Sequence, residues 1–485
     1  MIDILWNVLS FVVALGILVA VHEWGHFYVA RRCGVKVLRF SIGFGKVLWR
    51  RTDKHGTEFV IAAIPLGGYV KMLDDRAEQV PPVLLSASFN QKTVGQRFAI
   101  VAAGPMVNFI FAGLVLTLMY VIGVTALRPV VGDIQPDSIA QRAGLTKGMQ
   151  IIKIGDRYVS DWEAVNLELV SYIGATNIPI TVVNTGLSDS STALNTASFG
   201  SSNTVRFYDH QANDMQMGSG IFAQQTVTLE TNTWVFAPDQ QSAMDSLGFA
   251  VFRPEATMDV GFISPDGAAQ RAGMQINDKI LQIDGTLLTN WEQTVATIKQ
   301  RPSEDIEITV GRNGDIIRLY ATLDARDTQS GRIGVLGVSP KFTPWPDGMV
   351  YEQRHGLFGA MQLGATKTWR LMTLSIDMIS KLFTGDVSVK SLNGPVSIAQ
   401  GAGASASYGL VYFLSFLALI SVNLGIINLF PLPMLDGGHL MYYLVEWVTG
   451  KPVSEEIQEV GFRIGAVILF SLMSIAIFND IMRIT

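Results

Sequence analysis

The chain has 485 residues, a net charge of -5 at pH 7 and a mean hydropathy of +0.32, and only 16% of its residues are charged. Soluble proteins carry roughly a quarter charged residues, so this composition predicts a membrane protein with several domains. The acidic balance gives no support to a nucleic-acid partner, and the single cysteine, Cys33, excludes an intrachain disulfide framework and a cysteine-based zinc cluster.

Four apolar stretches are near the ~20 residues that a helix needs to cross a bilayer. They lie at about 4–28, 98–127, 408–430 and 460–480. The first does not resemble a cleavable signal peptide, because it has no basic leading region and no small-residue cleavage site. Basic residues gather between the first two spans, so the positive-inside rule places that loop in the cytosol. We therefore expect both termini and the long 128–400 region on the outer side of the membrane.

The first apolar span contains the sequence VHEWGH at residues 21–26. His22 and His26 are four residues apart on an expected helix, so both project from one face, with Glu23 between them. In an HExxH motif the two imidazoles bind zinc and the glutamate acts on the metal-bound water. Chance matches occur in soluble helices without metal. An ionisable group at mid-membrane, however, costs roughly 2.5–3.5 kcal/mol and is functional by default. The motif therefore predicts a zinc site.

Two apolar segments follow this motif, VKVLRFSIGFGKVLWRR at 35–51 and TEFVIAAIPLGGYVKML at 57–73. Their β-branched and aromatic residues flank a DKHG turn and predict a pair of strands. HExxH is the motif of zinc metalloproteases, and a transmembrane helix would have to unwind before such an enzyme could cleave it. An exposed sheet edge would hold the unwound segment by adding it as a strand. The alternative is a small cytosolic β domain without a role in substrate binding.

The expected outer region contains a sequence repeat. Residues 129–163 align without gaps on residues 258–292. The shared positions include Gly132/Gly261, Pro136/Pro265, Ala140/Ala269, Gly144/Gly273, Ile154/Ile283 and Trp162/Trp291. Each copy predicts a strand, a short helix, a second strand, a tight turn and another helix. Two tandem domains are therefore expected over about 125–325, and each resembles the circularly permuted PDZ domain of bacterial envelope proteases.

A PDZ-like domain binds an extended peptide or a chain terminus in a groove. We expect this groove along the first strand of each copy, and the alternative is that the same residues are ordinary core and turn residues. The candidate groove residues are Val131, Gly132, Ile134, Val260, Gly261, Phe262 and Ile263.

Two further segments of the outer region have distinct compositions. Residues 185–225 are rich in Ser, Thr, Asn and Gly, and they predict an insertion in the first copy. Residues 357–383 mix apolar positions with Lys367, Arg370 and Asp377, which predicts a helix that lies along the membrane surface.

The third apolar span ends in NLFPLPMLDGGH at residues 428–439, and Asp436 is the candidate for a third zinc ligand. A carboxylate there is costly unless it is paired or bound to a metal. His22 lies ~25 Å along its span at about 1.5 Å per residue, and Asp436 lies similarly far along its own. Two alternatives stay open. Asp436 could cap the next helix in a cytosolic loop. His439 could bind the metal, support the site through a hydrogen bond, or lie at the membrane interface.

Three motifs in this order, HEWGH at 22–26, GPMVN at 104–108 and NLFPLPMLDGG at 428–438, resemble those of the site-2 protease family of intramembrane zinc metalloproteases. The resemblance covers nearly the whole chain apart from the polar insertion. With four spans and two PDZ-like domains, the chain is similar to one bacterial branch of the family. The resemblance implies that the two motif histidines and Asp436 hold zinc and that Glu23 is catalytic. It also implies substrate-contacting residues, which are Asn428, Pro431, Pro433, Gly43, Phe44 and Gly45.

The same resemblance implies a zinc endopeptidase of the bacterial inner membrane that cleaves the transmembrane segments of single-span proteins. An anti-sigma factor of the envelope stress response is the expected substrate, with remnant signal peptides as a second class. The PDZ-like pair is expected to exclude bulky intact substrates. The rival hypotheses are a non-catalytic membrane-anchored scaffold that binds through the repeats, and a transporter, which the lack of symmetry between membrane halves disfavours.

The expected fold is a polytopic α-helical membrane protein with four transmembrane helices, a membrane-associated β-element and two extracytoplasmic PDZ-like α+β domains. Its expected parts in chain order are a first span at 1–30, a cytosolic or membrane-reentrant β region at 31–97, a second span at 98–127, a first PDZ-like domain at 128–245, a second at 246–325, a linker and surface helix at 326–407, a third span at 408–440, and a cytosolic loop with the fourth span at 441–485.

Overall fold

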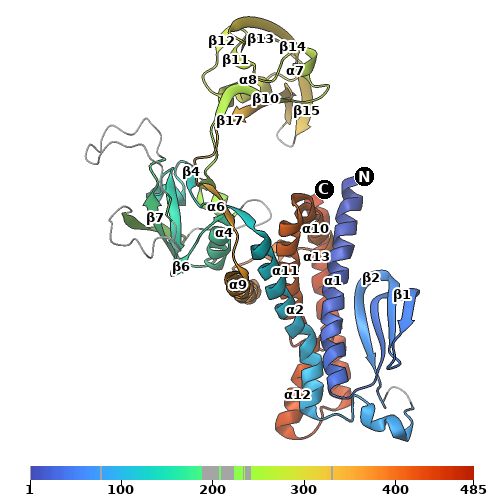
Figure 1. The fold of residues 1–485 in the computed structure, drawn as a ribbon. Coiled ribbons are helices and arrows are strands. Elements are labelled where there is room, and N and C mark those ends of the chain that lie inside the picture. The colour runs from blue at the N-terminus through green and yellow to red at the C-terminus, as the bar shows by residue number, and fades with distance from the viewer. Residues whose placement is uncertain are drawn as a thin grey trace.

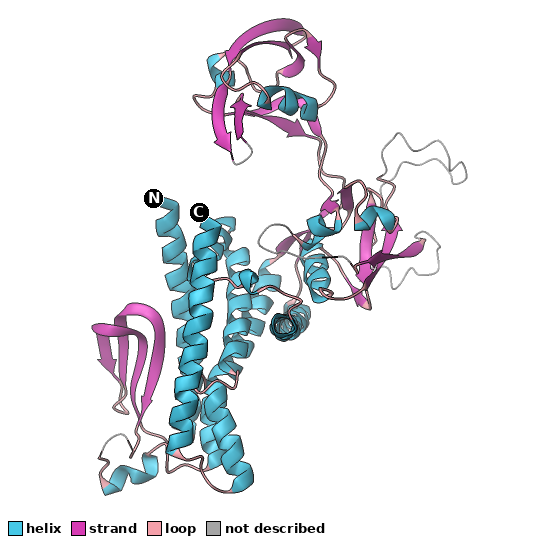
Figure 2. Cartoon of the chain, turned by 180° about the vertical axis from the view of Figure 1, so that it is seen from behind, coloured by secondary structure: helices cyan, strands magenta, loops and turns pink. Residues whose placement is uncertain are grey.

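The computed structural model describes residues 2–76, 79–187, 207–208, 223–232, 234, 242–328 and 331–484. Most of the expected 185–225 insertion lies outside these residues. Figure 1 shows a group of long helices, a small β sheet beside the first of them, and two α+β units that project from the helices. Figure 2 shows from behind that the long helices lie side by side and that the strands gather outside them.

Four of the helices are long and apolar enough to cross a membrane. They are α1 (Ile2–Arg32), α2 (Val94–Ile122), α11 (Leu410–Asn428) and α13 (Glu455–Ile484). Their number among the described residues matches the four spans that the sequence predicts. Together with the sheets, they give the coarse architecture of a membrane protein with β domains.

The ends of α2 follow from local sequence signals. The helix begins at a capping box in which Thr93 and Gln96 each bond the other's backbone N–H. It stops at Gly123, whose φ of 108° lies in a region that other residues rarely adopt. The expected end at residue 127 is therefore wrong, because the chain leaves the helix there and forms β3 (Val124–Leu127).

The segment expected at 408–440, an apolar span at about 408–430 followed by the motif with Asp436, consists of two helices. α11 ends at Asn428, and α12 (Asp436–Thr449) starts after a turn that contains Pro431 and Pro433. Proline cannot continue a helix ladder, which explains why the apolar run breaks at this point.

α9 (Leu357–Thr384) runs crosswise to the long helices, so Figure 1 views it end-on beside α2. Gly364 allows the two helices to approach closely, because a Cβ there would lie 2.9 Å from the carbonyl oxygen of Gly113. The helix also exposes apolar side chains, among them Phe358, Trp369, Ile376 and Phe383. A short helix, η2 (Val389–Ser391), and α10 (Pro395–Tyr408) follow, and α10 packs on α1.

β1 (Val37–Thr52) and β2 (Glu58–Met72) form the predicted pair of strands, and η1 (Pro82–Ala87) follows them. Both strands bend, so that they pair along three ladders. Residues 47–52 pair with 58–62, residues 58–61 pair with 39–42, and residues 37–44 pair with 64–72. The second half of β2 is therefore one edge of this sheet.

The two sequence repeats fold into two units with matching elements. The first unit contains β4 (Val131–Ile134), α3 (Ile139–Arg142), β5 (Met149–Ile154), β6 (Arg157–Tyr158), α4 (Trp162–Ser171), β7 (Asn177–Asn184), β8 (Gln224–Glu230), α6 (Ala243–Leu247) and β9 (Phe249–Val251). The second contains β10 (Ala256–Ile263), α7 (Ala268–Arg271), β11 (Lys279–Ile283), β12 (Thr286–Leu287), α8 (Trp291–Lys299), β13 (Asp305–Arg312), β14 (Asp315–Thr322), β15 (Asp324–Thr328), β16 (Gly331–Val335) and β17 (Val338–Phe342). Each unit has its own apolar core.

The hairpins of the two units explain where the polar insertion lies. In the second unit, β13 and β14 are joined by a two-residue turn, Asn313-Gly314, which is a favoured hairpin turn. In the first unit, the equivalent strands β7 and β8 pair in the same way but are separated by residues 185–223. The insertion therefore replaces a tight turn and leaves the pairing of the flanking strands unchanged.

A peptide can be added to a sheet only along a strand edge that has no partner. The strands expected to line the two grooves already have partner strands along that edge. Val260, Gly261, Phe262 and Ile263 lie on β10, which pairs with β17 on one side and β11 on the other. In the first unit, the strand that holds Val131, Gly132 and Ile134 pairs with β9. Its Val131 also accepts a hydrogen bond from the backbone of Gly148, the residue directly before β5. A peptide added as a strand would meet β17 or β9 instead, so the placement of the groove edge on β10 and β4 is wrong.

The chain returns from the second unit toward the helices as a strand. β18 (Val350–Gln353) pairs antiparallel with β3, directly after the end of α2. This pairing brings the two ends of the segment 124–353 together, and the chain then continues into α9.

Candidate metal centre

α1 brings His22 and His26 together one helical turn apart. Both are buried, with 9% of each residue exposed, and their Nε2 atoms lie 3.3 Å apart. Gly25 allows α1 to approach α2 here, because a Cβ at this position would lie 2.5 Å from the carbonyl oxygen of Ala103. The glycine of HEWGH is thus required by helix packing.

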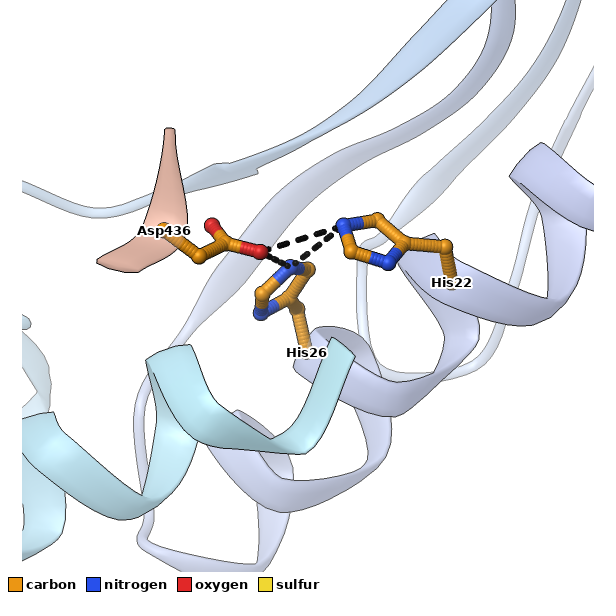
Figure 3. A group of neighbouring side chains, drawn as sticks. All are labelled: His22, His26 and Asp436. Atoms are coloured by element: carbon orange, nitrogen blue, oxygen red, sulfur yellow. Dashed lines mark hydrogen bonds and ion pairs between the residues drawn. The ribbon is translucent and has the colours of Figure 1, made fainter. Parts of the chain in front are cut away.

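Asp436 reaches the two histidines from the first turn of α12, as Figure 3 shows. Its Oδ2 lies 3.2 Å from Nε2 of His22 and 3.4 Å from Nε2 of His26. The turn needs the two glycines that follow, because a Cβ on either Gly437 or Gly438 would collide with carbonyl groups of residues 429–432. The alternative in which the carboxylate caps α12 is wrong, since the cap position of that helix is Leu435 and no side chain caps it.

These three side chains fit a divalent metal ion such as Zn²⁺. One ligand atom from each lies within 4.8 Å of the others, and Oδ2 of Asp436 is buried without a hydrogen-bond donor. Lone pairs that converge on one buried position are unfavourable unless a cation or a proton lies between them. Two histidines and one carboxylate are also a donor set of catalytic zinc sites, which keep a fourth position open. Within the described residues His439 is not part of this group, and its ring packs edge-on against Tyr442.

The GPMVN segment of α2 lies behind the two histidines. A Cβ on Gly104 would collide with Nε2 of His26 and would lie 2.9 Å from Cε1 of His22. On the outer side of the rings, Nδ1 of His26 is 2.9 Å from the carbonyl oxygen of Ile100, and the amide of Asn108 is 3.2 Å from Nδ1 of His22. Our sequence analysis assigned no role to Gly104 or Asn108. Their four-residue spacing, which puts both on one face of an apolar helix, is the signal that could have found them.

An ion pair fixes α12 against α2. Arg97, in the first turn of α2, bonds Glu446 at 2.7 Å, and both side chains are largely buried. The guanidinium also lies over the ring of Tyr443. Because α12 begins at Asp436, this pair holds the helix that presents the carboxylate.

Glu23 faces the edge of the small sheet. A Cβ on Gly68 of β2 would lie 3.1 Å from Cγ of Glu23 and 2.7 Å from Cγ1 of Val19, so β2 runs directly against α1. The backbone of Val70, on the same strand, interacts with the Glu23 carboxylate. The open strand edge and the glutamate are therefore neighbours.

The other predicted substrate residues lie at different places. Nδ2 of Asn428 is 3.5 Å from Nε2 of His22, so this residue is at the centre itself. Pro433 packs against α13, because a Cβ on Gly461 or Gly465 would lie 3.1 Å from its ring.

The Gly43-Phe44-Gly45 segment forms the bend of β1. Both glycines have positive φ angles of 91° and 85°, which allow the strand to turn there. Phe44 is 45% exposed and stacks on Tyr69 of β2, with ring centroids 6.0 Å apart. The segment thus belongs to the sheet whose edge faces Glu23.

The chain matches the model of peptidase family M50 over residues 10–472. It is 46% identical over 484 residues to the regulator of sigma E protease of Salmonella typhi and to the regulator of sigma-E protease RseP of Escherichia coli strain K12, and each alignment covers 100% of both chains. It is 44% identical over 485 residues to a putative zinc metalloprotease of Vibrio cholerae, again across 100% of both chains.

The chain therefore belongs to peptidase family M50, the site-2 protease family, and it is an intramembrane zinc metalloprotease. Within that family it is similar to RseP over its whole length, which confirms the bacterial branch indicated by the sequence.

Proposed function

We propose that His22, His26 and Asp436 hold the catalytic zinc and that Glu23 is the general base. The observation that carries this proposal is the convergence of two Nε2 atoms and one carboxylate oxygen from separate helices at distances of 3.2–3.4 Å. Zinc, when bound, supplies a Lewis acid that makes water more acidic and polarises the scissile carbonyl.

The protein side chains move the protons and orient the substrate. Glu23 accepts a proton from the attacking water and passes it to the leaving nitrogen as the C–N bond breaks. The amide of Asn428 donates a hydrogen bond to the substrate backbone beside the scissile bond, and its distance of 3.5 Å from Nε2 of His22 supports this role.

The substrate binds as an added strand along the edge half of β2. Residues 64–72 pair on one side with β1, and Gly68 brings this strand against α1 at Glu23. Backbone hydrogen bonds along a sheet edge would hold an unwound helix in an extended form, independent of its sequence. The Gly43-Phe44-Gly45 bend shapes this sheet and so helps to present the substrate. Pro431 and Pro433 keep the chain between α11 and α12 in a fixed turn next to the metal.

The two repeat units act as PDZ-like domains on the periplasmic side, and the metal centre lies toward the cytosolic side of the inner membrane. In this arrangement the basic 31–97 region is cytosolic and both termini are periplasmic. The apolar side chains exposed on α9 support a helix that rests in the membrane surface. The units exclude membrane proteins whose bulky outer domains are intact.

The substrates are single-span membrane proteins, with an anti-sigma factor of the envelope stress response as the principal one and remnant signal peptides as a second class. The names of the relatives, which describe regulators of sigma E, support the first class.

A cleavage assay with the purified chain tests this function. A single-span substrate in detergent should be cut inside its transmembrane segment, and both a zinc chelator and Glu23→Gln should abolish the reaction. The chelated enzyme should recover on addition of zinc, whereas the variant should not. Equal cleavage by Glu23→Gln and the unmodified chain would refute the proposed role of this residue.

A further inference from the structure

Asn108 is a fully buried polar residue that the proposed mechanism does not use. None of it is exposed. Its Nδ2 lies 3.2 Å from Nδ1 of His22, and its Oδ1 is buried without a hydrogen-bond partner among the described residues. The other ring nitrogen of His22, Nε2, lies 3.2 Å from Oδ2 of Asp436. The two nitrogens of this ring thus face different partners, and the amide lies on the side away from the proposed zinc ligands.

The second histidine shows what an outer partner does. Nδ1 of His26 is 2.9 Å from the carbonyl oxygen of Ile100, and a carbonyl only accepts hydrogen bonds. The ring proton of His26 must therefore lie on Nδ1, which leaves the lone pair of Nε2 directed at Asp436. His22 has a side-chain amide at the equivalent place, and an amide can present either its oxygen or its nitrogen.

We propose that Asn108 is the positioning residue for His22, and that its Oδ1 accepts a hydrogen bond from Nδ1–H so that Nε2 is free to bind zinc. The amide oxygen and nitrogen are nearly equal in size, so a half-turn of this group exchanges them without moving any other atom. With Nδ2 toward His22, the ring proton lies on Nε2 and faces Asp436. With Oδ1 toward His22, the proton lies on Nδ1 and the ring can act as a ligand.

Asn108 lies where three helices pack together, and the bond from the third helix reaches its main chain rather than its side-chain amide. The hydroxyl of Ser421 on α11 donates a hydrogen bond to the main-chain oxygen of Asn108 at 2.8 Å, and Ser421 is also fully buried. One turn earlier on α2, Gly104 provides the space into which both imidazoles fit. The helix therefore supplies the space at residue 104 and the orienting bond at residue 108.

Metal affinity of four variants tests this inference, which rests on the proposed zinc site. Asn108→Leu removes the acceptor at nearly constant volume, Asn108→Asp keeps an acceptor, Ser421→Ala removes the neighbouring hydrogen bond that does not touch His22, and His22→Ala removes a ligand. Zinc dissociation constants are measured by chelator competition with metal analysis, and the geometry is followed by the visible absorption spectrum of the cobalt-substituted full chain.

Loss of an orienting partner typically costs about 10–100-fold in metal affinity. We therefore expect Asn108→Leu to raise the zinc dissociation constant by about that factor and to change the cobalt spectrum, with Asn108→Asp and Ser421→Ala close to the unmodified chain. Two results would overturn the inference. One is unchanged zinc affinity and an unchanged cobalt spectrum in Asn108→Leu. The other is an Asn108→Asp variant that binds zinc as weakly as Asn108→Leu, which would also be the result if any change at this site only disturbed folding.

His22→Ala separates this inference from the proposed function. If that variant held zinc as tightly as the unmodified chain, the proposed zinc site itself would be wrong. If it lost zinc while Asn108→Leu kept it, the site would stand and only the role of Asn108 would fall.

Discussion

The two repeat units share an order of elements, but their buried carboxylates have different partners. In the second unit, the fully buried side chain of Asp278 accepts two hydrogen bonds of 2.7 Å from Arg312 of the same unit. In the first unit, Glu168 on α4 accepts one of 2.6 Å from Arg370, which belongs to α9. The buried ion pair thus stabilises the second unit internally, whereas it fastens the first unit to a helix outside it.

Further contacts strengthen the attachment of the first unit. Lys367 of α9 bonds Glu163 of α4 at 2.8 Å, and Lys381 donates to the main-chain oxygen of Ser171. A cavity of about 590 Å³ lies between the unit and α9, and Glu168 is among its lining residues. Figure 1 shows the second unit apart from the helices. The first unit is therefore suited to move together with α9, and the second to move on its own.

Breaking the internal pair of the second unit should have the largest effect. Arg312→Met leaves the Asp278 carboxylate buried without its partner, and removing one partner of a buried pair typically costs about 3–5 kcal/mol. Hydrogen exchange of β13 in the full chain should report a loss of this size in local stability. Exchange of α1 should stay unchanged, because the damage is confined to the second unit.

The double change Asp278→Asn with Arg312→Met is the matched control, since it removes both charges. It should recover much of the lost protection. Protection in Arg312→Met equal to that of the unmodified chain would show that the pair is not what holds the second unit together.

Breaking the pair between the first unit and α9 should have a smaller effect of a different kind. In Arg370→Met, Glu168 can regain water when α4 lifts away, so we expect a loss of about 1.5–3 kcal/mol in docking rather than unfolding of the unit. Spin labels can be attached at the exposed residues Gln141, in the first unit, and Tyr408, at the end of α10, with Cys33 replaced by serine. The distribution of distances between these labels should become broader in Arg370→Met. Hydrogen exchange of β7 should remain that of the unmodified chain, and faster exchange there would mean that the unit itself had lost stability.

The repeat could be predicted from sequence because its signals are local. Gly144 and Gly273 end short helices after the same number of residues, and Trp162 and Trp291 begin the next helix in each copy. The edge of each sheet could not be predicted in this way. β17 pairs with β10 but lies far along the chain from it. The alternation of apolar residues in a strand shows which face is buried, but it does not show which strand pairs on which side.

At the candidate metal centre, too, the sequence predicted the local motif but not the contacts between segments that are distant in the chain. HEWGH is a local pattern, and the cost of a carboxylate in an apolar segment pointed to Asp436. The partners on α2 depend on how closely two helices approach, and that distance is set by Gly25 and Gly104. A glycine in an apolar helix has many possible reasons, so the sequence alone gives no role to Asn108 behind it.

The two units should also respond differently to pH. Burial raises the pKa of Glu168 above its usual range, although Arg370 and Arg157 oppose this. The carboxyl of Glu168 therefore binds a proton more tightly when the first unit is docked on α9 than when it is hydrated. Protonation at low pH stabilises the docked state, and this stabilisation is lost as the pH rises through the raised pKa. Burial acts on Asp278 in the same direction, but the hydrogen bonds from Arg312 and the backbone of Gln275 outweigh it and hold the pKa of Asp278 below its usual range.

Stability from Asp278 is therefore retained above the unfolded pKa of about 3.9, and it is lost only as pH falls further. Lowering the pH from about 7 to about 5 should narrow the distribution of distances between the spin labels at positions 141 and 408. Hydrogen exchange of β13 should stay unchanged over the same range. A broader distance distribution at the lower pH would contradict the predicted direction in which protonation of Glu168 changes docking.

The smallest effect is expected at the exposed end of the same interface. Lys367 is largely buried, but more than half of its partner's side chain, that of Glu163, is exposed to solvent. Half-exposed pairs contribute about 0.2–1 kcal/mol, so Lys367→Met should shift the distance distribution far less than Arg370→Met does. Added salt should weaken the Lys367 contribution and leave that of Arg370 nearly constant, because screening acts mainly on exposed charges. Equal effects of the two substitutions would mean that the first unit is held by the total charge of α9 rather than by the buried pair.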